Sequence, residues 1–174
     1  MKIIKSIISI AILSLAGMAL RGQNASPAIV AGIGCGDLTL GASRNSIEVA
    51  LGQGECVQKM NGSYLLNYAS KGLQFSFLKG ADKVQAIFFY NRARRFEQFA
   101  SFKGKTALGI DWNSPVDQVI KAYGKPIGDI SGKNSGGTYR RLVFKGIDFL
   151  YEDGRMVRIS LFNDKTSSQS NKSS

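Results

Sequence analysis

The chain has 174 residues, of which 44% are hydrophobic and 20% charged, with 23 basic residues, 12 acidic residues and no histidine. This composition is typical of a globular protein, and it indicates neither a disordered chain nor one built from membrane-spanning helices. Without histidine, Ser-His-Asp and Cys-His catalytic groups and histidine-ligated metal sites are excluded.

Residues 1–22 have the layout of a secretory signal peptide. Lys2 and Lys5 precede an apolar run of 14 residues from Ile7 to Leu20, and small or polar residues follow. Cleavage is expected between residues 19 and 25. A buried helix or an uncleaved membrane anchor would give a similar run. No cysteine ends the run, which argues against a lipoprotein. We therefore expect an exported protein, periplasmic or extracellular and in contact with the cell envelope.

Export changes how the charge is interpreted. Three of the basic residues lie in the signal, which leaves 20 basic against 12 acidic residues and a net charge of +8. In the cytoplasm this surplus would favour nucleic acid as a partner. Outside it, the available anions are phospholipids, lipopolysaccharide, teichoic acid or acidic proteins, so no nucleic-acid partner is expected. A soluble basic surface with no dedicated partner is the simpler alternative.

Residues 23–37 form a connecting segment, in which Gly32 to Gly36 is too rich in glycine for regular structure. Cys35 and Cys56 flank a predicted helix. An oxidising compartment favours a disulfide between them, closing a loop of about 20 residues. Two sulfurs without histidine are too few for a zinc site, and their spacing is not that of a redox pair. We expect no metal and no cofactor.

Residues 38–90 and residues 110–162 repeat one pattern with an offset of about 72 residues. Corresponding apolar and glycine positions recur in the same order in both segments. They are Leu40, Ile47, Gly52, Gly72, Phe75, Phe77, Ile87 and Phe89 in the first, and Trp112, Val119, Gly124, Gly146, Phe149, Tyr151, Ile159 and Leu161 in the second. Repeated core positions indicate a shared scaffold, while function depends on the residues that do not repeat.

The first repeat predicts a short helix capped by Ser43 and ended by Gly52. Strands are expected at residues 55–60, 63–69, 73–78 and 84–90. The first two strands are joined by Asn61-Gly62, the sequence that a type I′ hairpin favours. The last strand is apolar on both faces, which makes it a candidate for the contact between the repeats.

The second repeat predicts a helix with Ser114 as N-cap and Pro115 at its first position, ended by Gly124. Strands are expected at residues 127–131, 138–144, 147–151 and 156–162, with a flexible loop at 132–137. Residues 163–174 are polar and should form a disordered tail.

These elements predict an α+β fold. It consists of two tandem repeats, each a short helix followed by a four-stranded antiparallel meander, packed into one body. Each repeat alone is near the lower size limit for stable folding, so the two should pack together.

The repeat openings carry a resemblance to a known type of module. Leu40 to Arg44, followed by Ile47 and Gly52, resembles the opening of exported repeats of the β-lactamase-inhibitor-protein type. It is equally similar to the small lipoprotein of the outer-membrane β-barrel assembly machinery. Residues 52–56 resemble the segment after the helix in that inhibitor, where a cysteine enters the first strand. Residues 109–126 resemble the same unit, with Trp112 and Asn113 replacing its usual Leu-Gly.

The likeness spans residues 38–162 in two copies. It implies an α+β fold, export and non-enzymatic protein binding. It does not imply β-lactamase inhibition, because the shared residues are structural. The cysteine pattern also departs from the family, since a second cysteine precedes the helix here and the second repeat has none.

The linker at residues 91–109 is the most promising functional segment, because basic and aromatic side chains alternate in it. Such side chains bind bases, phospholipid headgroups or protein partners. Alternatively, its phenylalanines, spaced three apart, pack between the repeats. The candidate binding residues are Arg92, Arg94, Arg95, Phe96, Phe99, Lys103 and Lys105, with Arg140 and Arg141 as a second basic spot beside the predicted 132–137 loop.

The sequence therefore predicts an exported, non-enzymatic cell-envelope module that holds another protein in a binding or assembly role. The alternative is a protein that binds a membrane surface or an anionic polymer through a basic patch. An enzyme is the least favoured class, because no convergent set of catalytic residues is found, and Glu152-Asp153 is expected in a solvated turn.

Overall fold

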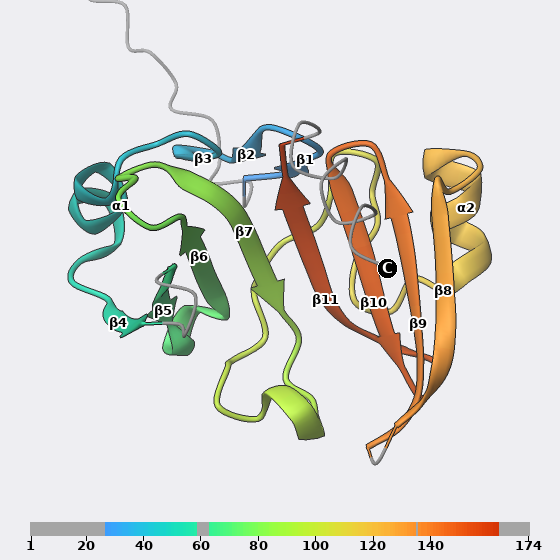
Figure 1. The fold of residues 1–174 in the computed structure, drawn as a ribbon. Coiled ribbons are helices and arrows are strands. Elements are labelled where there is room, and N and C mark those ends of the chain that lie inside the picture. The colour runs from blue at the N-terminus through green and yellow to red at the C-terminus, as the bar shows by residue number, and fades with distance from the viewer. Residues whose placement is uncertain (1–26, 59–62, 135, 164–174) are drawn as a thin grey trace, which may run out of the picture.

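The structure is a computed structural model that describes residues 27–58, 63–134 and 136–163. It has an α+β fold with two α-helices, a three-stranded sheet in the order β1-β2-β3 and an eight-stranded antiparallel sheet (Figure 1). The order of the large sheet is β4-β5-β6-β7-β11-β10-β9-β8. The predicted fold class is confirmed at this level. The predicted signal peptide, the Asn61-Gly62 turn and the tail from residue 164 lie outside the described residues.

The first helix, α1 (Arg44–Leu51), begins and ends where the sequence predicts. The Ser43 side chain caps it by accepting a hydrogen bond from the backbone N–H of Ser46, and Gly52 ends it with a φ of 87°. Ile47 is its buried residue. Four strands and a short 3₁₀ turn follow: β4 (Glu55–Gln58), β5 (Tyr64–Tyr68), η1 (Ala69–Lys71), β6 (Leu73–Phe77) and β7 (Val84–Tyr90).

The second helix, α2 (Val116–Tyr123), has Pro115 as its N-cap and no side-chain cap. The prediction of Ser114 as the cap is therefore wrong. The Ser114 hydroxyl instead accepts a hydrogen bond from the backbone N–H of Asp111 at 3.1 Å, and its carbonyl accepts one from the Tyr151 hydroxyl at 2.9 Å. The backbone before α2 is thus held to the sheet, and the Ser114 side chain stabilises the turn that precedes the helix.

The last four strands are β8 (Gly128–Asn134), β9 (Gly137–Phe144), β10 (Ile147–Glu152) and β11 (Arg155–Phe162). The flexible loop predicted at residues 132–137 is wrong, because β8 and β9 continue through most of it, with Gly132 paired to Tyr139. A side chain at Gly132 would meet the Tyr139 hydroxyl at 2.9 Å. This glycine makes room for a neighbour within a strand.

The small sheet consists of β1 (Ile29–Val30), β2 (Gly34–Cys35) and β3 (Leu38–Thr39), and β2 lies within the 32–36 segment that was predicted to be irregular. The sheet lies across one end of the large sheet (Figure 1). A Cβ on Gly146 would lie 2.6 Å from the backbone nitrogen of Gly32, so these two backbones touch. Gly146, in its left-handed conformation, is needed there as a glycine.

The predicted disulfide is wrong, because Cys35 and Cys56 are both free. Cys35 is buried in β2, where its thiol donates to the Pro27 carbonyl, whereas Cys56 is exposed on β4 in the other sheet. Burial raises the pKa of the Cys35 thiol to about 11. Closeness in sequence across α1 does not place the two sulfurs together.

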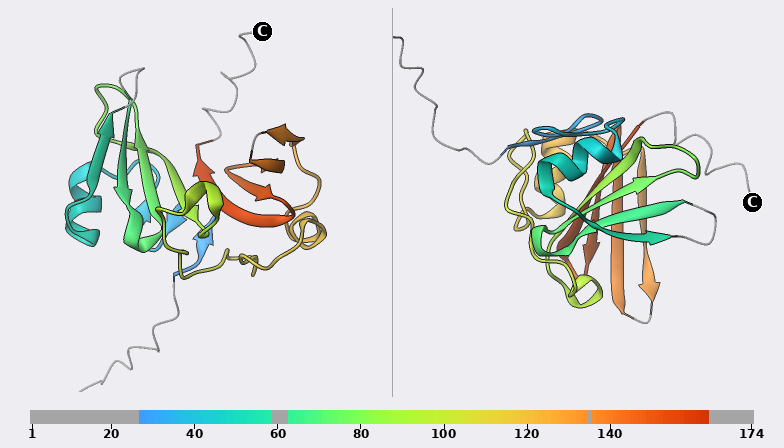
Figure 2. Two further views of the ribbon diagram at one scale, coloured as in Figure 1. Left: turned by 90° about the horizontal axis from the view of Figure 1, so that it is seen from below. Right: turned by 90° about the vertical axis from the view of Figure 1, so that its left-hand side faces the viewer.

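The large sheet is curved, and both helices lie on its convex side (Figure 2). Between the helices and the sheet lies one hydrophobic core, which includes Phe75, Phe89 and Phe149, all fully buried. Among the described residues, no α-helix lies over the concave side, and the linker covers only the part near Tyr90. We call this side the concave face.

Strand β7 lies where the two groups of four strands meet, because it pairs with β6 on one side and β11 on the other. Its two apolar faces have different partners. Phe89 faces the core and contacts Phe102 of the linker at a ring distance of 4.8 Å, while Tyr90 packs against Phe99 at 4.0 Å. The linker thus wraps around the end of β7, and its phenylalanines do not share one buried face.

Candidate functional site

The concave face carries rows of polar and aromatic side chains across its central strands. Residues directly opposite each other in an antiparallel sheet point to the same side. One row, across β5, β6, β7, β11 and β10, is Asn67, Gln74, Phe88, Ser160 and Asp148. The neighbouring row is Tyr90, Arg158, Leu150 and Arg141. These residues share the concave face because each of them alternates with a core-facing residue along its strand.

Asp148 is a buried carboxylate at the centre of this face. Its side chain is 1% exposed, and its Oδ2 accepts hydrogen bonds from Nε and Nη2 of Arg141. Its Oδ1 has no hydrogen-bond partner among the described residues, and the same holds for the buried Ser160 Oγ and Arg158 Nε. Ser160 lies directly across from Asp148, and Arg158 lies two residues before Ser160. We call Asp148, Arg158 and Ser160 the unpaired polar cluster.

The side chains beside this cluster are held in place. The Arg158 guanidinium lies 5.3 Å from the Phe88 ring centre. The Tyr90 hydroxyl donates to Gln74 at 2.9 Å, and the Gln74 amide donates to Asn67 at 2.7 Å. Burial raises the pKa of Tyr90 above its ordinary value, and the charge of Arg158 opposes that shift. Tyr90 therefore acts as a neutral hydrogen-bond donor at physiological pH.

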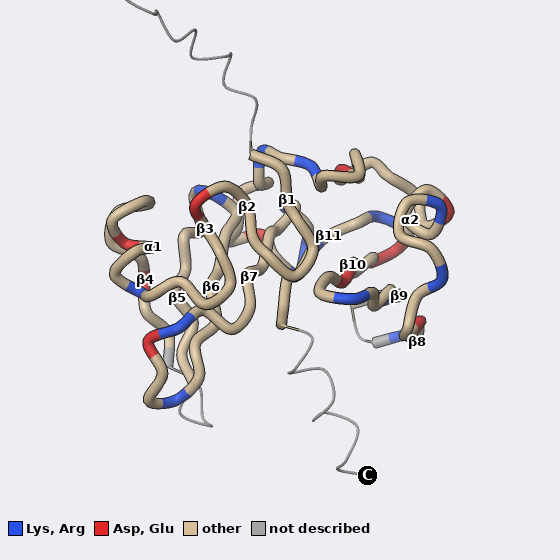
Figure 3. The backbone as a smooth tube through the Cα atoms, turned by 90° about the horizontal axis from the view of Figure 1, so that it is seen from above, with Lys and Arg blue, Asp and Glu red and all other residues tan. Residues whose placement is uncertain are grey.

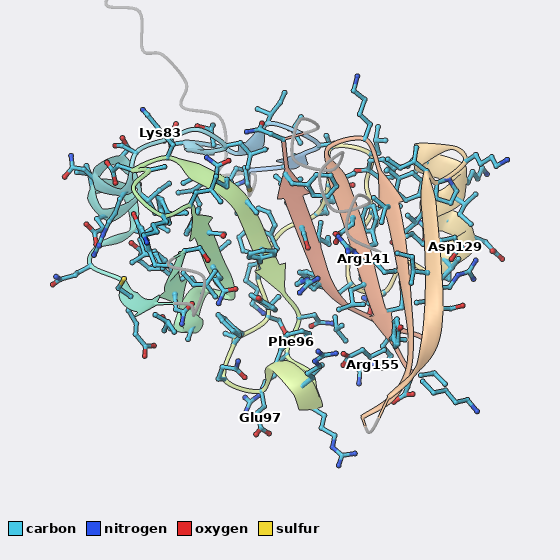
Figure 4. The ribbon with its side chains drawn as sticks, in the orientation of Figure 1. Lys83, Phe96, Glu97, Asp129, Arg141 and Arg155 are labelled. Atoms are coloured by element: carbon cyan, nitrogen blue, oxygen red, sulfur yellow. The ribbon has the colours of Figure 1, made fainter. Side chains whose placement is uncertain are left out.

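A pocket of about 230 Å³ lies at the end of the sheet away from β1–β3, and we call it the end pocket. Figure 4 labels Arg155, which lines this pocket, at the lower end of the sheet, with Arg141 higher up; Phe96 belongs to the short 3₁₀ turn η2 (Arg94–Phe96). Its lining comes from the linker and from the ends of the β8–β9 and β10–β11 hairpins. These residues are Asn91, Arg92, Ala93, Arg94, Gly136, Glu152, Asp153, Arg155 and Val157.

The linker side of the end pocket is anchored to the sheet. The Asn91 backbone donates to the Val157 carbonyl at 2.9 Å, and its side chain donates to the Met156 carbonyl at 3.1 Å. The Ser101 hydroxyl donates to Asn91 at 2.8 Å. Phe96 packs against Tyr90 at a ring distance of 4.9 Å. The backbone that carries the arginines is therefore held to the sheet.

The structure divides the basic residues predicted for binding. Only Arg92 and Arg94 line the end pocket. Arg95 pairs with Glu152 at 3.3 Å on the pocket rim, Arg140 pairs with Asp129 at 2.8 Å, and Arg141 pairs with Asp148. Of the rest, Phe99 is buried, Phe96 is half-buried, and Lys103 and Lys105 are exposed outside the pocket.

Four residues of these sites were not predicted from the sequence: Asp148, Arg155, Arg158 and Ser160. Arg155 joins Arg92 and Arg94 only through the pairing of β7 with β11. The other three alternate with core residues, as solvent-facing residues do, so the sequence gives no sign that they are buried.

At the end of the molecule opposite the end pocket, basic and acidic positions along the backbone are interspersed (Figure 3).

The described residues contain no group of three or more metal-ligating side chains placed to hold an ion. Within the same residues, no helix is long and apolar enough to cross a membrane.

Comparison with known proteins gives two structures of similar arrangement. One is YjgB, a DUF4309 family protein of Bacillus subtilis, with 15% sequence identity and a TM-score of 0.47, covering 76% of this chain and 88% of that chain. The other is a cysteine-rich secretory protein of Staphylococcus aureus, with 8% identity and a TM-score of 0.44, covering 73% of this chain and 45% of that chain. No family model and no curated protein matches the sequence. The resemblance to β-lactamase-inhibitor-type repeats therefore stays a prediction.

Proposed function

We propose that this chain is an exported, non-enzymatic cell-envelope module that holds another protein on its concave face. The observation that carries the proposal is the unpaired polar cluster at the centre of a sheet face that no α-helix of the described residues covers. A buried polar group without a partner costs about 1–3 kcal/mol. These atoms are themselves buried, so the neighbouring side chains must move aside before a partner reaches them, and its hydrogen-bond donors and acceptors would then recover this energy.

The surroundings of the cluster support a protein partner. Arg is enriched among the residues that dominate protein–protein binding energy, and Arg141, which is 41% exposed, lies in one row with Arg158. Because donors and acceptors alternate across the face, a polypeptide with mixed polar groups would complement it better than an ion of one sign would.

The proposal includes the tandem repeat, which the pairing of β7 with β11 supports. Phe88 faces Ser160, a residue 72 positions later, which is the offset between the predicted repeats. On either side, Ile87 faces Leu161 and Phe89 faces Ile159. The same offset relates Ile87 to Ile159 and Phe89 to Leu161, so the pairing is symmetric, as for two like units joined about a twofold axis.

Export rests on the amino-terminal sequence alone, with its basic start and apolar run. The alternative function, binding of an anionic surface or polymer, is supported by the surplus of arginine around the end pocket. Ionic strength separates the two. Binding through surface charge weakens steeply with salt, whereas binding through the concave face should change little.

Affinity capture from an envelope extract tests the proposal. We compare the mature chain with a variant that carries Leu65→Arg and Ser76→Arg, two half-buried, directly paired residues of the concave face. The matched control carries Val49→Arg and Ile127→Arg, two exposed apolar residues elsewhere. The captured protein should be lost with the first variant and retained with the control, at low and physiological salt alike.

Equal capture by both variants, both folded by circular dichroism, would contradict use of the concave face. Turnover of a substrate by the purified chain, abolished by one polar substitution, would contradict the non-enzymatic class.

A further inference from the structure

We propose that the end pocket is a binding site for a single phosphate group, separate from the concave face. Arg92 and Arg94 from the linker and Arg155 from the β10–β11 hairpin line it together. Among the described residues, none of these three guanidinium groups forms an ion pair. Guanidinium presents paired N–H donors that match the oxygens of a phosphate.

The two acidic residues of the pocket are already engaged. Glu152 pairs with Arg95 at 3.3 Å. Asp153 Oδ1 accepts hydrogen bonds from the backbone N–H of Thr138 at 2.9 Å and from its hydroxyl at 3.0 Å. These bonds, with the nearby charge of Arg94, lower the pKa of Asp153, so it stays ionised.

The local charge suits a phosphate. Arg92, Arg94, Arg95 and Arg155 face two carboxylates, Glu152 and Asp153, which leaves a surplus of two positive charges around the pocket. A phosphate monoester carries about −1.5 to −2 at pH 7. A carboxylate would leave part of the surplus uncompensated, and a cation would be repelled.

The size and surroundings point to a small, solvent-borne group. A pocket of about 230 Å³ is smaller than the roughly 300–1,000 Å³ typical of sites for drug-sized ligands. The exposed large apolar side chains among the described residues are Val30, Ile33, Val49, Leu78, Leu108, Ile127 and Ile130. None of them lines the end pocket. The rim therefore lacks the apolar anchors of a membrane-inserting surface, which favours a phosphate in solution over a lipid headgroup.

The experiment is a titration of the purified mature chain with inorganic phosphate at constant ionic strength. Calorimetry and amide NMR shifts measure the binding. The test variant carries Arg92→Ala and Arg155→Ala. The control carries Lys121→Ala and Lys125→Ala, which removes the same charge from exposed positions in and just after α2. We expect saturable binding, weakened at least about tenfold in the test variant and unchanged in the control.

A second arm uses vesicles of phosphatidylcholine with and without phosphatidic acid. Binding of free phosphate without vesicle binding supports a soluble phosphate ligand. Vesicle binding that depends on phosphatidic acid and on the two arginines keeps the pocket but assigns the phosphate to a lipid. No saturable binding in either arm, or equal losses in test and control variants, overturns the proposal.

The result is independent of the protein-binding proposal. The Arg92→Ala/Arg155→Ala variant should still capture a protein partner through the concave face. A chain that binds phosphate but captures no protein would refute only the proposed function.

Discussion

The two faces of the large sheet are built from the same strands, yet they are buried in different ways. On the convex side, Phe75, Phe89 and Phe149 are fully buried in one hydrophobic core, and the Phe149 ring packs against Tyr123 of α2. On the concave side, residues that alternate with them are also buried at the centre, but three of their polar atoms have no hydrogen-bond partner in the part of the chain that the structure describes. Burial on the convex side stabilises the fold, whereas on the concave side part of it is energetically unfavourable. That difference is the basis for proposing the concave face as the binding surface.

The largest expected loss of stability comes from a substitution in the core on the convex side. Phe149→Ala removes a fully buried ring that contacts Tyr123 and Phe144, and it should cost about 4 kcal/mol of unfolding free energy. Phe88→Ala removes a half-buried concave ring and should cost less than half as much. Urea unfolding measures both. Equal losses would contradict the difference between the faces.

A smaller effect tests the buried carboxylate of the concave face. Arg141→Ala leaves Asp148 unpaired and should cost about 2 kcal/mol, below the range for fully buried pairs because the arginine is 41% exposed. The double variant Arg141→Ala/Asp148→Ala should be destabilised by less than the sum of the two single changes. Additive losses in a double-mutant cycle would show that the two side chains act independently.

The fold was predictable where local signals and tertiary structure agree. The 84–90 strand was predicted with the bounds that β7 has, because its apolar run ends at turn residues. The α1 helix followed from a serine cap and a terminal glycine. The small sheet was missed because its strands have two residues each, too few for any periodic pattern.

The sites were less predictable, because they depend on contacts between distant segments. Arg92 and Arg94 were identified from composition, but Arg155, which completes the pocket, joins them only through sheet pairing. The disulfide failed for the same reason. Two cysteines 21 positions apart belong to different sheets, and their spacing carries no information about that separation.

Two buried tyrosines, one on each side of the sheet, should make the stability of the fold depend on pH above about pH 9. Tyr151 faces α2 and Tyr90 lies on the concave face, and burial raises the pKa of both above the ordinary value of about 10. The unfolded chain loses these protons first, so the stability they give is present below about pH 10 and falls as the pH rises further.

Each Tyr→Phe variant removes one hydrogen bond and should cost about 1 kcal/mol at pH 8. Each should also lose less stability than the parent chain between pH 9 and pH 11. Parallel pH profiles for variant and parent, from urea unfolding, would contradict neutral burial of that tyrosine.

The smallest effect distinguishes two buried serines. Ser114 is 4% exposed and its hydroxyl accepts a backbone hydrogen bond, so Ser114→Ala should cost about 1 kcal/mol. Ser160 is 2% exposed and its hydroxyl has no partner among the described residues, so Ser160→Ala should leave stability unchanged or raise it slightly. If Ser160→Ala keeps the fold but loses capture of the partner, this hydroxyl serves binding at the expense of stability. A loss of 1 kcal/mol or more would mean that the fold itself satisfies the hydroxyl, and the proposed binding face would then lose one of the three atoms on which the proposal rests.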